Sequence, residues 1–158
     1  MAYPKAPAKR NESDLLTSVE GDVNAPMDVV FDVITDFELF VELEEPVKEV
    51  ITDPNVEKGK GYKSHWEMED PESGEKWSCD EEILYYDKPR QYAYAGYGSN
   101  GKNYSGVHTL SQNPDGSTHH VFNEVHHFAG EPEIYTEILK QLLDNVKKEA
   151  EKRYQAGN

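Results

Sequence analysis

The sequence has little cysteine, no long apolar run and few basic residues, and each shortage excludes a class of protein. Its single cysteine, Cys79, rules out an intrachain disulfide framework and favours a reducing compartment, so we expect a cytoplasmic protein. No apolar run approaches the ~20 residues of a membrane-spanning helix. Only 16 Lys and Arg stand against 31 Asp and Glu, a net charge of −15, which argues against binding nucleic acid or anionic membrane surfaces.

A length of 158 residues favours one domain, long enough to hold a core and a cavity together. Residues 1–14 contain basic side chains but no apolar stretch after them, so we expect a flexible lead-in and not a signal peptide. The domain itself is expected over residues 15–154, followed by a flexible tail at 155–158. The acidic excess fits either a salt-rich cytoplasm or simple solubility, and composition does not separate the two.

Hydrophobic periodicity predicts one strand, two short helices, six strands and one long helix. Residues 15–24 alternate as a strand, and Asn24 with Pro26 is expected to begin a helix that runs to Ile34. A second short helix is expected over about residues 36–43. Strand patterns bounded by turn residues follow at 47–53, 62–69, 75–86, 91–97, 104–112 and 117–128.

The clearest hairpin surrounds Asn113-Pro114-Asp115-Gly116, a sequence that suits a type I turn with a glycine bulge. Pairing Asn113 with Ser117 places Tyr104 opposite His126. The face with the larger aromatic groups is assigned to the interior, although a slip of one residue would reverse it. This face consists of Tyr104, His108, Leu110, His120, Phe122, Glu124, His126 and Phe128.

A long amphipathic helix closes the chain, from Pro132 to about Tyr154. Its apolar residues recur at helical spacing, so one stripe is expected to pack on the sheet. That stripe is Ile134, Ile138, Leu142 and Val146.

This order of elements resembles the helix-grip fold of the START-like (SRPBCC) superfamily, and most closely its polyketide cyclase/dehydrase and lipid transport branch. The resemblance rests on Val23-Asn24-Ala25-Pro26, on the helix that ends in Asp36-Phe37, on Gly59-Lys60-Gly61 and on Asp87-Lys88-Pro89-Arg90. It implies an α+β fold, with a curved antiparallel sheet of about seven strands wrapped around the long C-terminal helix and two short helices after the first strand. Many members have a Trp soon after Asp-Phe, whereas this chain has Phe40, so the cavity entrance is expected to differ.

The resemblance implies a cavity for an apolar or aromatic small molecule between the sheet and the C-terminal helix. Tyr and Trp stack on flat ligands and keep a polar tip for hydrogen bonds. The alternative is that these rings simply fill the core. The expected ligand-binding residues are Tyr62, Trp66, Met68, Trp77, Ile83, Tyr85, Tyr92, Tyr94, Leu110, Phe122, Phe128, Ile138 and Leu142.

Four polar residues on the inward face are candidate catalytic groups: Tyr104, His108, Glu124 and His126. Together they could move protons next to a carbonyl, which aldol cyclisation and dehydration require. An aromatase/cyclase-type enzyme acting on a polyketone is therefore an alternative to a binding protein. A further alternative is that the same groups only orient a ligand or satisfy one another in the core.

Metal and cofactor chemistry are weaker interpretations. Glu124 and His126 with His108 or His120 could ligate a metal, but no metal site is expected. The glycine-bearing segment 96–101 lacks the features of a phosphate loop, and no cofactor is expected. The expected partner is an apolar small molecule, although a protein-interaction or co-chaperone-like module stays open. The oligomeric state is not predicted.

Overall fold

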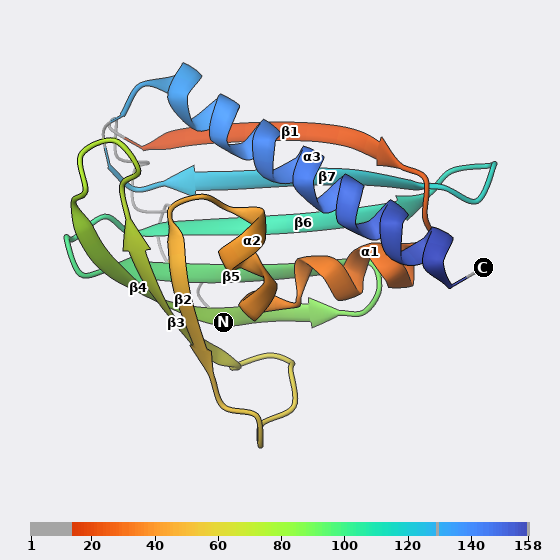
Figure 1. Cartoon of the computed structure of the whole chain (residues 1–158), viewed down its shortest axis with the longest axis horizontal. Helices are drawn as coiled ribbons and strands as arrows, with labels where there is room; N and C mark the ends of the chain where they lie inside the picture. The colour runs from red at the N-terminus through yellow and green to blue at the C-terminus, as the bar shows by residue number, and fades with distance from the viewer. Residues whose placement is uncertain (1–13, 129, 158) are drawn as a thin grey trace, which may run out of the picture.

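The computed structural model describes residues 14–128 and 130–157. The expected flexible lead-in therefore lies outside the described residues except for Asp14. Two short helices follow the first strand, and a long helix ends the chain (Figure 1). The elements are β1 (Leu15–Val23), α1 (Met27–Ile34), the 3-10 helix η1 (Phe37–Leu39), α2 (Phe40–Leu43), β2 (Val47–Thr52), β3 (Lys63–Glu69), β4 (Lys76–Asp87), β5 (Gln91–Gly98), β6 (Tyr104–Gln112), β7 (Thr118–His126) and α3 (Pro132–Ala156).

The seven strands form one antiparallel sheet in the order β1-β7-β6-β5-β4-β3-β2. Helix α3 crosses the front of this sheet over β1, β7 and β6, and α1 and α2 cover the same face beside it (Figure 1). This arrangement confirms the predicted helix-grip fold. The hairpin register is also confirmed, because Tyr104 pairs with His126 and His108 with Phe122. Helix α3 continues to Ala156, two residues into the expected tail.

Aromatic side chains of the short helices fill one end of the inner face. Phe31 meets the ring of Tyr92 edge to face at 6.1 Å between centroids, and Phe37 lies 6.0 Å from the rings of both Tyr62 and Trp66. Edge-to-face and tilted contacts of this kind add to the free energy of simple burial. This end of the sheet is therefore a closed aromatic core.

Polar contacts fix α3 against the short helices. Arg153 pairs with Asp36 at 3.0 Å, and Asn145 Nδ2 donates to the carbonyl of Leu43 at 2.8 Å. The backbone N–H of Asn24 donates to Glu151 Oε2 at 2.8 Å. Asn24 therefore does not cap α1 as predicted; the cap position is Pro26, whose side chain makes no capping bond.

The buried stripe of α3 differs from the prediction near the start of the helix. Leu142 and Val146 are buried as expected, but Ile134 is 53% exposed and Ile138 is 38% exposed. Residues four apart advance by about 40° around an α-helix, so a strict four-residue spacing turns by about 120° over three steps. The sheet instead receives Leu139. The prediction that Ile134 and Ile138 belong to the stripe packed on the sheet is thus wrong.

A β-bulge in β4 reverses the predicted side of Tyr85. Ile83 pairs with Tyr94 and Tyr85 with Ala93, so Leu84 is one extra residue on β4. Tyr85 consequently turns outward and is 49% exposed, and Tyr86 takes the inward position, with its ring 5.3 Å from that of Phe31. Assigning Tyr85 to the ligand-binding face was wrong because alternation does not hold across a bulge.

Candidate functional site

Two parallel rows of cross-strand neighbours occupy the inner face of the sheet. In the first row, Glu81 on β4, Gly96 on β5 and Tyr104 on β6 are cross-strand neighbours. The Tyr104 ring covers Gly96 so closely that a Cβ there would lie 2.6 Å from its Cε1. The Tyr104 hydroxyl reaches across the glycine and donates to Glu81 Oε2 at 2.5 Å.

The second row lies two residues along β5 and β6 and extends to β7, with its tyrosine and glutamate in the opposite order. Tyr94 on β5 pairs with Gly106 on β6, which pairs with Glu124 on β7. A Cβ at Gly106 would lie 2.5 Å from Cζ of Tyr94. The Tyr94 hydroxyl donates to Glu124 Oε2. Each tyrosine therefore reaches a glutamate two strands away because the strand between them has no side chain at that point.

His126 joins the second row to α3. Its Nε2 lies 2.7 Å from Glu124 Oε1, and its ring centroid lies 4.3 Å from that of Tyr135 on α3. We call the set Tyr94, Tyr104, Glu81, Glu124 and His126 the Tyr–Glu network.

Two buried polar atoms beside Glu124 have no hydrogen-bond partner among the described residues: His126 Nδ1 and Thr17 Oγ1. Thr17 is the β1 neighbour of Glu124 and is 3% exposed, and the His126 side chain is 6% exposed. A buried polar atom without a partner costs about 1–3 kcal/mol. Both atoms are enclosed by packed side chains, so a polar group would reach them only if this packing opened.

Burial changes the protonation of the acids in this region. It raises the pKa of Glu81 to about 8, against the opposing effect of the Tyr104 hydrogen bond. It also raises the pKa of Glu44, the residue after α2, to about 7, with a further contribution from the charge of Glu124. Burial raises the pKa of the Cys79 thiol to about 11, so this thiol is protonated at neutral pH. Glu81 keeps its proton at neutral pH and can therefore act as a hydrogen-bond donor or general acid.

Of the four candidate catalytic residues, the structure links Glu124 with His126 and places Tyr104 beside His126 on the neighbouring strand. His108 has different partners. Its Nδ1 lies 2.8 Å from His120 Nε2, and its ring stacks on Phe122 at 3.9 Å. Burial holds the pKa of His108 well below its usual value, so this histidine is a neutral core residue one row away from Glu124.

The expected ligand-binding residues divide into three groups. Tyr62, Trp66 and Tyr92 lie under the aromatic side chains of α1 and η1. Tyr94 belongs to the Tyr–Glu network, and Phe128 meets the His126 ring edge to face at 5.4 Å. The rest are inward core residues or half-buried neighbours, apart from the outward Tyr85 and the partly exposed Ile138: Met68, Trp77, Ile83, Leu110, Phe122 and Leu142.

Sequence reasoning missed Glu44, Thr17, Tyr135 and the two glycines. A signal for the glycines was present, because Tyr94-Ala95-Gly96 and Tyr104-Ser105-Gly106 repeat the pattern Tyr-X-Gly on consecutive strands. In antiparallel pairing each tyrosine then faces the other strand's glycine. The contributions of Glu44 and Thr17 depend on how distant elements meet, and the local sequence carries no sign of them.

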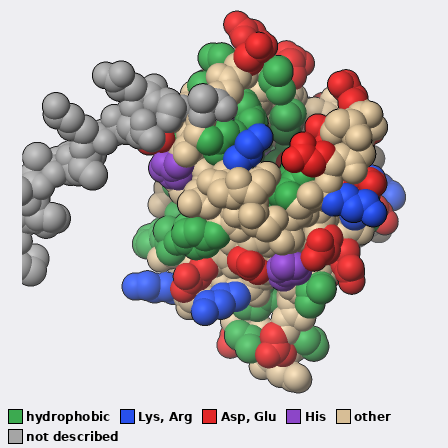
Figure 2. Space-filling view, turned by 90° about the vertical axis from the view of Figure 1, so that its left-hand side faces the viewer, with side chains coloured by type: hydrophobic (Ala, Val, Ile, Leu, Met, Phe, Trp, Pro, Cys, Tyr) green, Lys and Arg blue, Asp and Glu red, His purple; other side chains and the backbone are tan. Residues whose placement is uncertain are grey.

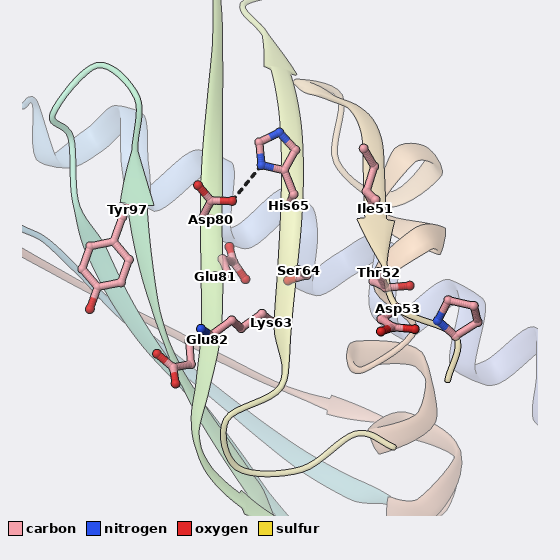
Figure 3. Close-up of a pocket in the computed structure, with 11 residues that line it drawn as sticks. Ile51, Thr52, Asp53, Lys63, Ser64, His65, Asp80, Glu81, Glu82 and Tyr97 are labelled. Carbon is pink, nitrogen blue, oxygen red and sulfur yellow. Dashed lines mark hydrogen bonds and ion pairs between the residues drawn. The ribbon is translucent and has the colours of Figure 1, made fainter. Parts of the chain in front are cut away.

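A groove of about 700 Å³ lies across β2, β3, β4 and β5, and its lining includes both the outward His65 and Glu81 of the Tyr–Glu network (Figure 3). Ile51, His65, Asp80 and Tyr97 cross it as one row of strand neighbours. Both ring nitrogens of His65 already bond to carboxylates, of Asp80 and Glu67, each at 2.7 Å. Because the ring nitrogens of His65 are already paired, we place the functional site at the Tyr–Glu network, whose Glu81 reaches this groove.

The described residues contain no group of three or more His, Cys, Asp or Glu arranged to hold a metal ion. Among the same residues, no helix is both long and apolar enough to cross a membrane. Figure 2 views the end of the molecule at the left of Figure 1 and shows acidic side chains spread around it.

Comparison with known proteins agrees with this fold. The family described as Polyketide cyclase / dehydrase and lipid transport matches residues 16–151. No curated protein matches the chain at a significant level.

Several solved structures are similar at low identity. The Zhui aromatase/cyclase from a Streptomyces species is 19% identical with a TM-score of 0.66, covering 89% of this chain and 95% of that one. Ara h 8.0201 is 17% identical with a TM-score of 0.67, covering 90% and 99%. Protein CV1439 from Chromobacterium violaceum is 15% identical with a TM-score of 0.67, covering 87% and 98%. At these identities the likeness shows the fold alone.

Proposed function

Because this chain belongs to the polyketide cyclase/dehydrase and lipid transport family, we propose that it binds an apolar or aromatic small molecule, of lipid or polyketide size, between the inner face of its sheet and α3. Apolar and aromatic walls with a few convergent polar groups are typical of small-molecule sites. The tyrosine rings of the network and the apolar side of α3 supply such walls here.

The observation that carries the proposal is the pair of unpartnered atoms beside Glu124. His126 Nδ1 and Thr17 Oγ1 are buried without partners, although Tyr94 and His126 Nε2 satisfy the glutamate itself. A ligand polar group that opened the packing and reached either atom would remove the cost of that atom. The apolar body of that ligand would then lie against Tyr104, Tyr135 and Leu142.

A substitution that fills the interior tests this function. We expect saturable binding of a neutral fluorescent probe, N-phenyl-1-naphthylamine, to the wild-type chain. Leu142→Trp adds bulk at a buried position of α3 that is 6% exposed, and it should weaken binding at least about tenfold. Leu84→Trp is the matched control, since Leu84 is 47% exposed on β4, and it should bind as wild type.

Circular dichroism identifies variants that do not fold. If Leu142→Trp unfolds, the smaller enlargement Leu142→Phe at the same buried position replaces it. The proposal is refuted if the wild-type chain does not bind the probe. It is also refuted if a folded variant with the larger side chain at Leu142 binds the probe as tightly as wild type.

A second candidate is an aromatase/cyclase-type enzyme, favoured by one observation. Glu81 keeps its proton up to a pH of about 8 and is hydrogen-bonded to Tyr104, so it has the protonation state that a general acid needs. The similar fold of an aromatase/cyclase supports the same candidate. In an assay of a linear polyketone, Glu81→Gln and His126→Gln should each lower kcat at least about 100-fold. Unchanged turnover in both folded variants would exclude this mechanism.

A further inference from the structure

The first row of the Tyr–Glu network continues past Glu81 to the groove. Ser64 on β3 is the cross-strand neighbour of Glu81, and Thr52 on β2 is the neighbour of Ser64. All three residues line the groove, and Figure 3 shows Ser64 and Glu81 on adjacent strands. Successive residues of a strand point to opposite faces, so Ser64 and Glu81 lie on the opposite face from the His65 ring. The groove therefore meets the network at two neighbouring polar side chains.

One oxygen of the Glu81 carboxyl is open. Tyr104 donates to Oε2 at 2.5 Å, whereas Oε1 has no hydrogen-bond partner among the described residues. Oε1 does not belong with the enclosed, unpartnered atoms beside Glu124, so a ligand can reach it without opening the packing. Because Oε2 accepts from Tyr104, the proton of the neutral carboxyl belongs on Oε1. Glu81 can therefore donate a hydrogen bond on the groove side of the network.

The Ser64 hydroxyl offers a second donor beside it. Ser64 is 6% exposed, and its Oγ accepts a hydrogen bond from Trp66 Nε1 at 2.8 Å. The hydroxyl proton itself has no acceptor within the part of the chain that the structure describes. Directly opposed residues of antiparallel strands have Cβ atoms about 4.5–5.5 Å apart. One acceptor atom between Ser64 and Glu81 can therefore receive both protons.

We propose that Ser64 and Glu81 form a two-donor site for the carbonyl oxygen of a neutral ligand, such as a ketone. This inference rests on the proposed function and names the polar group of its ligand. A carbonyl oxygen has two lone pairs and no proton, which matches two donors. An ammonium group has only donors and would find no acceptor at this pair. The apolar body of the ligand then lies against the ring of Tyr104, whose hydroxyl holds Glu81.

The site loses one of its donors when Glu81 ionises. Burial raises the pKa of Glu81 to about 8, and a carbonyl that accepts its proton raises this pKa further. The ionised carboxylate has no proton to donate and repels a carbonyl oxygen. The preference for a carbonyl should therefore be constant between pH 6 and 7 and fall towards pH 9.5.

Other titratable and charged groups surround Glu81 and the groove. Their ionisation acts alike on two uncharged probes of equal shape, so a difference between such probes reports on the carbonyl contact. These groups are Asp53 after β2, Lys63 and His65 on β3, Cys79, Asp80 and Glu82 on β4, Tyr92, Tyr94 and Tyr97 on β5, Tyr104 on β6, Glu124 on β7, Glu38 on η1 and Glu44 after α2.

Two uncharged tricyclic probes test the inference by fluorescence titration: 2-acetylanthracene and 2-isopropenylanthracene. They have the same shape and differ only in that a methylene group replaces the carbonyl oxygen. At pH 6.5 the ketone should bind the wild-type chain about tenfold more tightly than the alkene, because the alkene leaves both donors unpaired. At pH 9.5 the two affinities should agree within about twofold, with that of the alkene nearly unchanged.

Three variants separate the roles of the side chains. Glu81→Gln keeps a donor that does not titrate, so it should retain the ketone preference and remove its pH dependence. Ser64→Ala removes the second donor and should reduce the preference about threefold. Glu82→Gln is the matched control, since Glu82 lines the same groove from the opposite face of β4, and it should behave as wild type.

The outcomes distinguish this inference from the proposed function. If N-phenyl-1-naphthylamine binds but the ketone shows no advantage over the alkene in the wild-type chain, the carbonyl site is overturned and the proposed function stands. A pH dependence that persists in folded Glu81→Gln also overturns it. If neither N-phenyl-1-naphthylamine nor the two tricyclic probes bind, both proposals are overturned. The wild-type comparison needs no variant, so a poorly folded substitution does not affect it.

Discussion

Two glycines determine the geometry of the Tyr–Glu network. Gly96 and Gly106 leave the inner face open where Tyr104 and Tyr94 cross it, and each hydroxyl thereby reaches a carboxyl two strands away. Glycine inside a strand weakens the strand because it has no side chain to pack. Here the ring of the facing tyrosine fills that space, so the glycine and the tyrosine act as one packing unit.

Replacing one of these glycines tests the packing unit. In Gly106→Ala the new Cβ would overlap the buried Tyr94 ring, which must move away from Glu124. We expect a loss of about 2 kcal/mol in the free energy of unfolding, as for other overpacked cores. Gly59→Ala is the control, since nothing lies within 4 Å of a Cβ there. Urea unfolding measures both, and a change below about 0.5 kcal/mol for Gly106→Ala would contradict the account.

At the scale of elements, the sequence predicted the strands, helices and hairpin register that depend on local periodicity. The hairpin of β6 and β7 follows from alternation and one turn, and its register came out as predicted. Two other predictions failed. Periodicity alone does not determine which direction a helical stripe faces along a long helix, or on which face of the sheet a residue lies after a bulge. Three steps of four residues rotate the α3 stripe away from the sheet, and the bulge at Leu84 moves Tyr85 outward. The pairing of Thr17 with Glu124 and the electrostatic effect of Glu124 on Glu44 depend on tertiary packing, which no local pattern encodes.

The two neighbouring tyrosines of β4 provide a matched test of the bulge. Tyr86→Ala removes a ring that packs against Phe31 at 5.3 Å and should lower the free energy of unfolding by about 2 kcal/mol. Tyr85→Ala removes a ring that is 49% exposed and should cost below about 0.5 kcal/mol. Equal losses in urea unfolding for the two variants would mean that Tyr85 also packs inward.

Over the whole molecule, buried acids and buried histidines make opposite contributions to stability as the pH changes. Glu81 and Glu44 have folded pKa values of about 8 and about 7, above the usual value, so the folded chain holds more protons and loses stability as the pH rises from 4.5 towards those values. Burial lowers the pKa of His120 to about 4 and that of His108 well below the usual value. Their contribution is present above pH 6.5 and is lost as the pH falls below it.

Between pH 4.5 and 6.5 the loss of stability from the two glutamates and the gain from the two histidines offset each other. Above pH 6.5 only the glutamates still change the free energy of unfolding. We therefore expect the free energy of unfolding to fall by about 2 kcal/mol between pH 6.5 and 8.5. Glu81→Gln imitates the protonated acid and should remove most of this loss, whereas the exposed Glu49→Gln should keep it. Urea unfolding at several pH values measures the profile. A wild-type stability that rises over this range would show that Glu81 is ionised in the folded chain.

The central claim is that a ligand binds at the Tyr–Glu network beside His126 and not on the His65 side of the groove. Two histidines report on these places separately, because His126 is bonded to Glu124 and His65 lines the groove. The most direct measurement is NMR of the chain with labelled histidine rings, titrated with 9-anthracenemethanol. The account predicts a saturable shift of the His126 ring signals with those of His65 unchanged. A shift of His65 without one of His126 would contradict it.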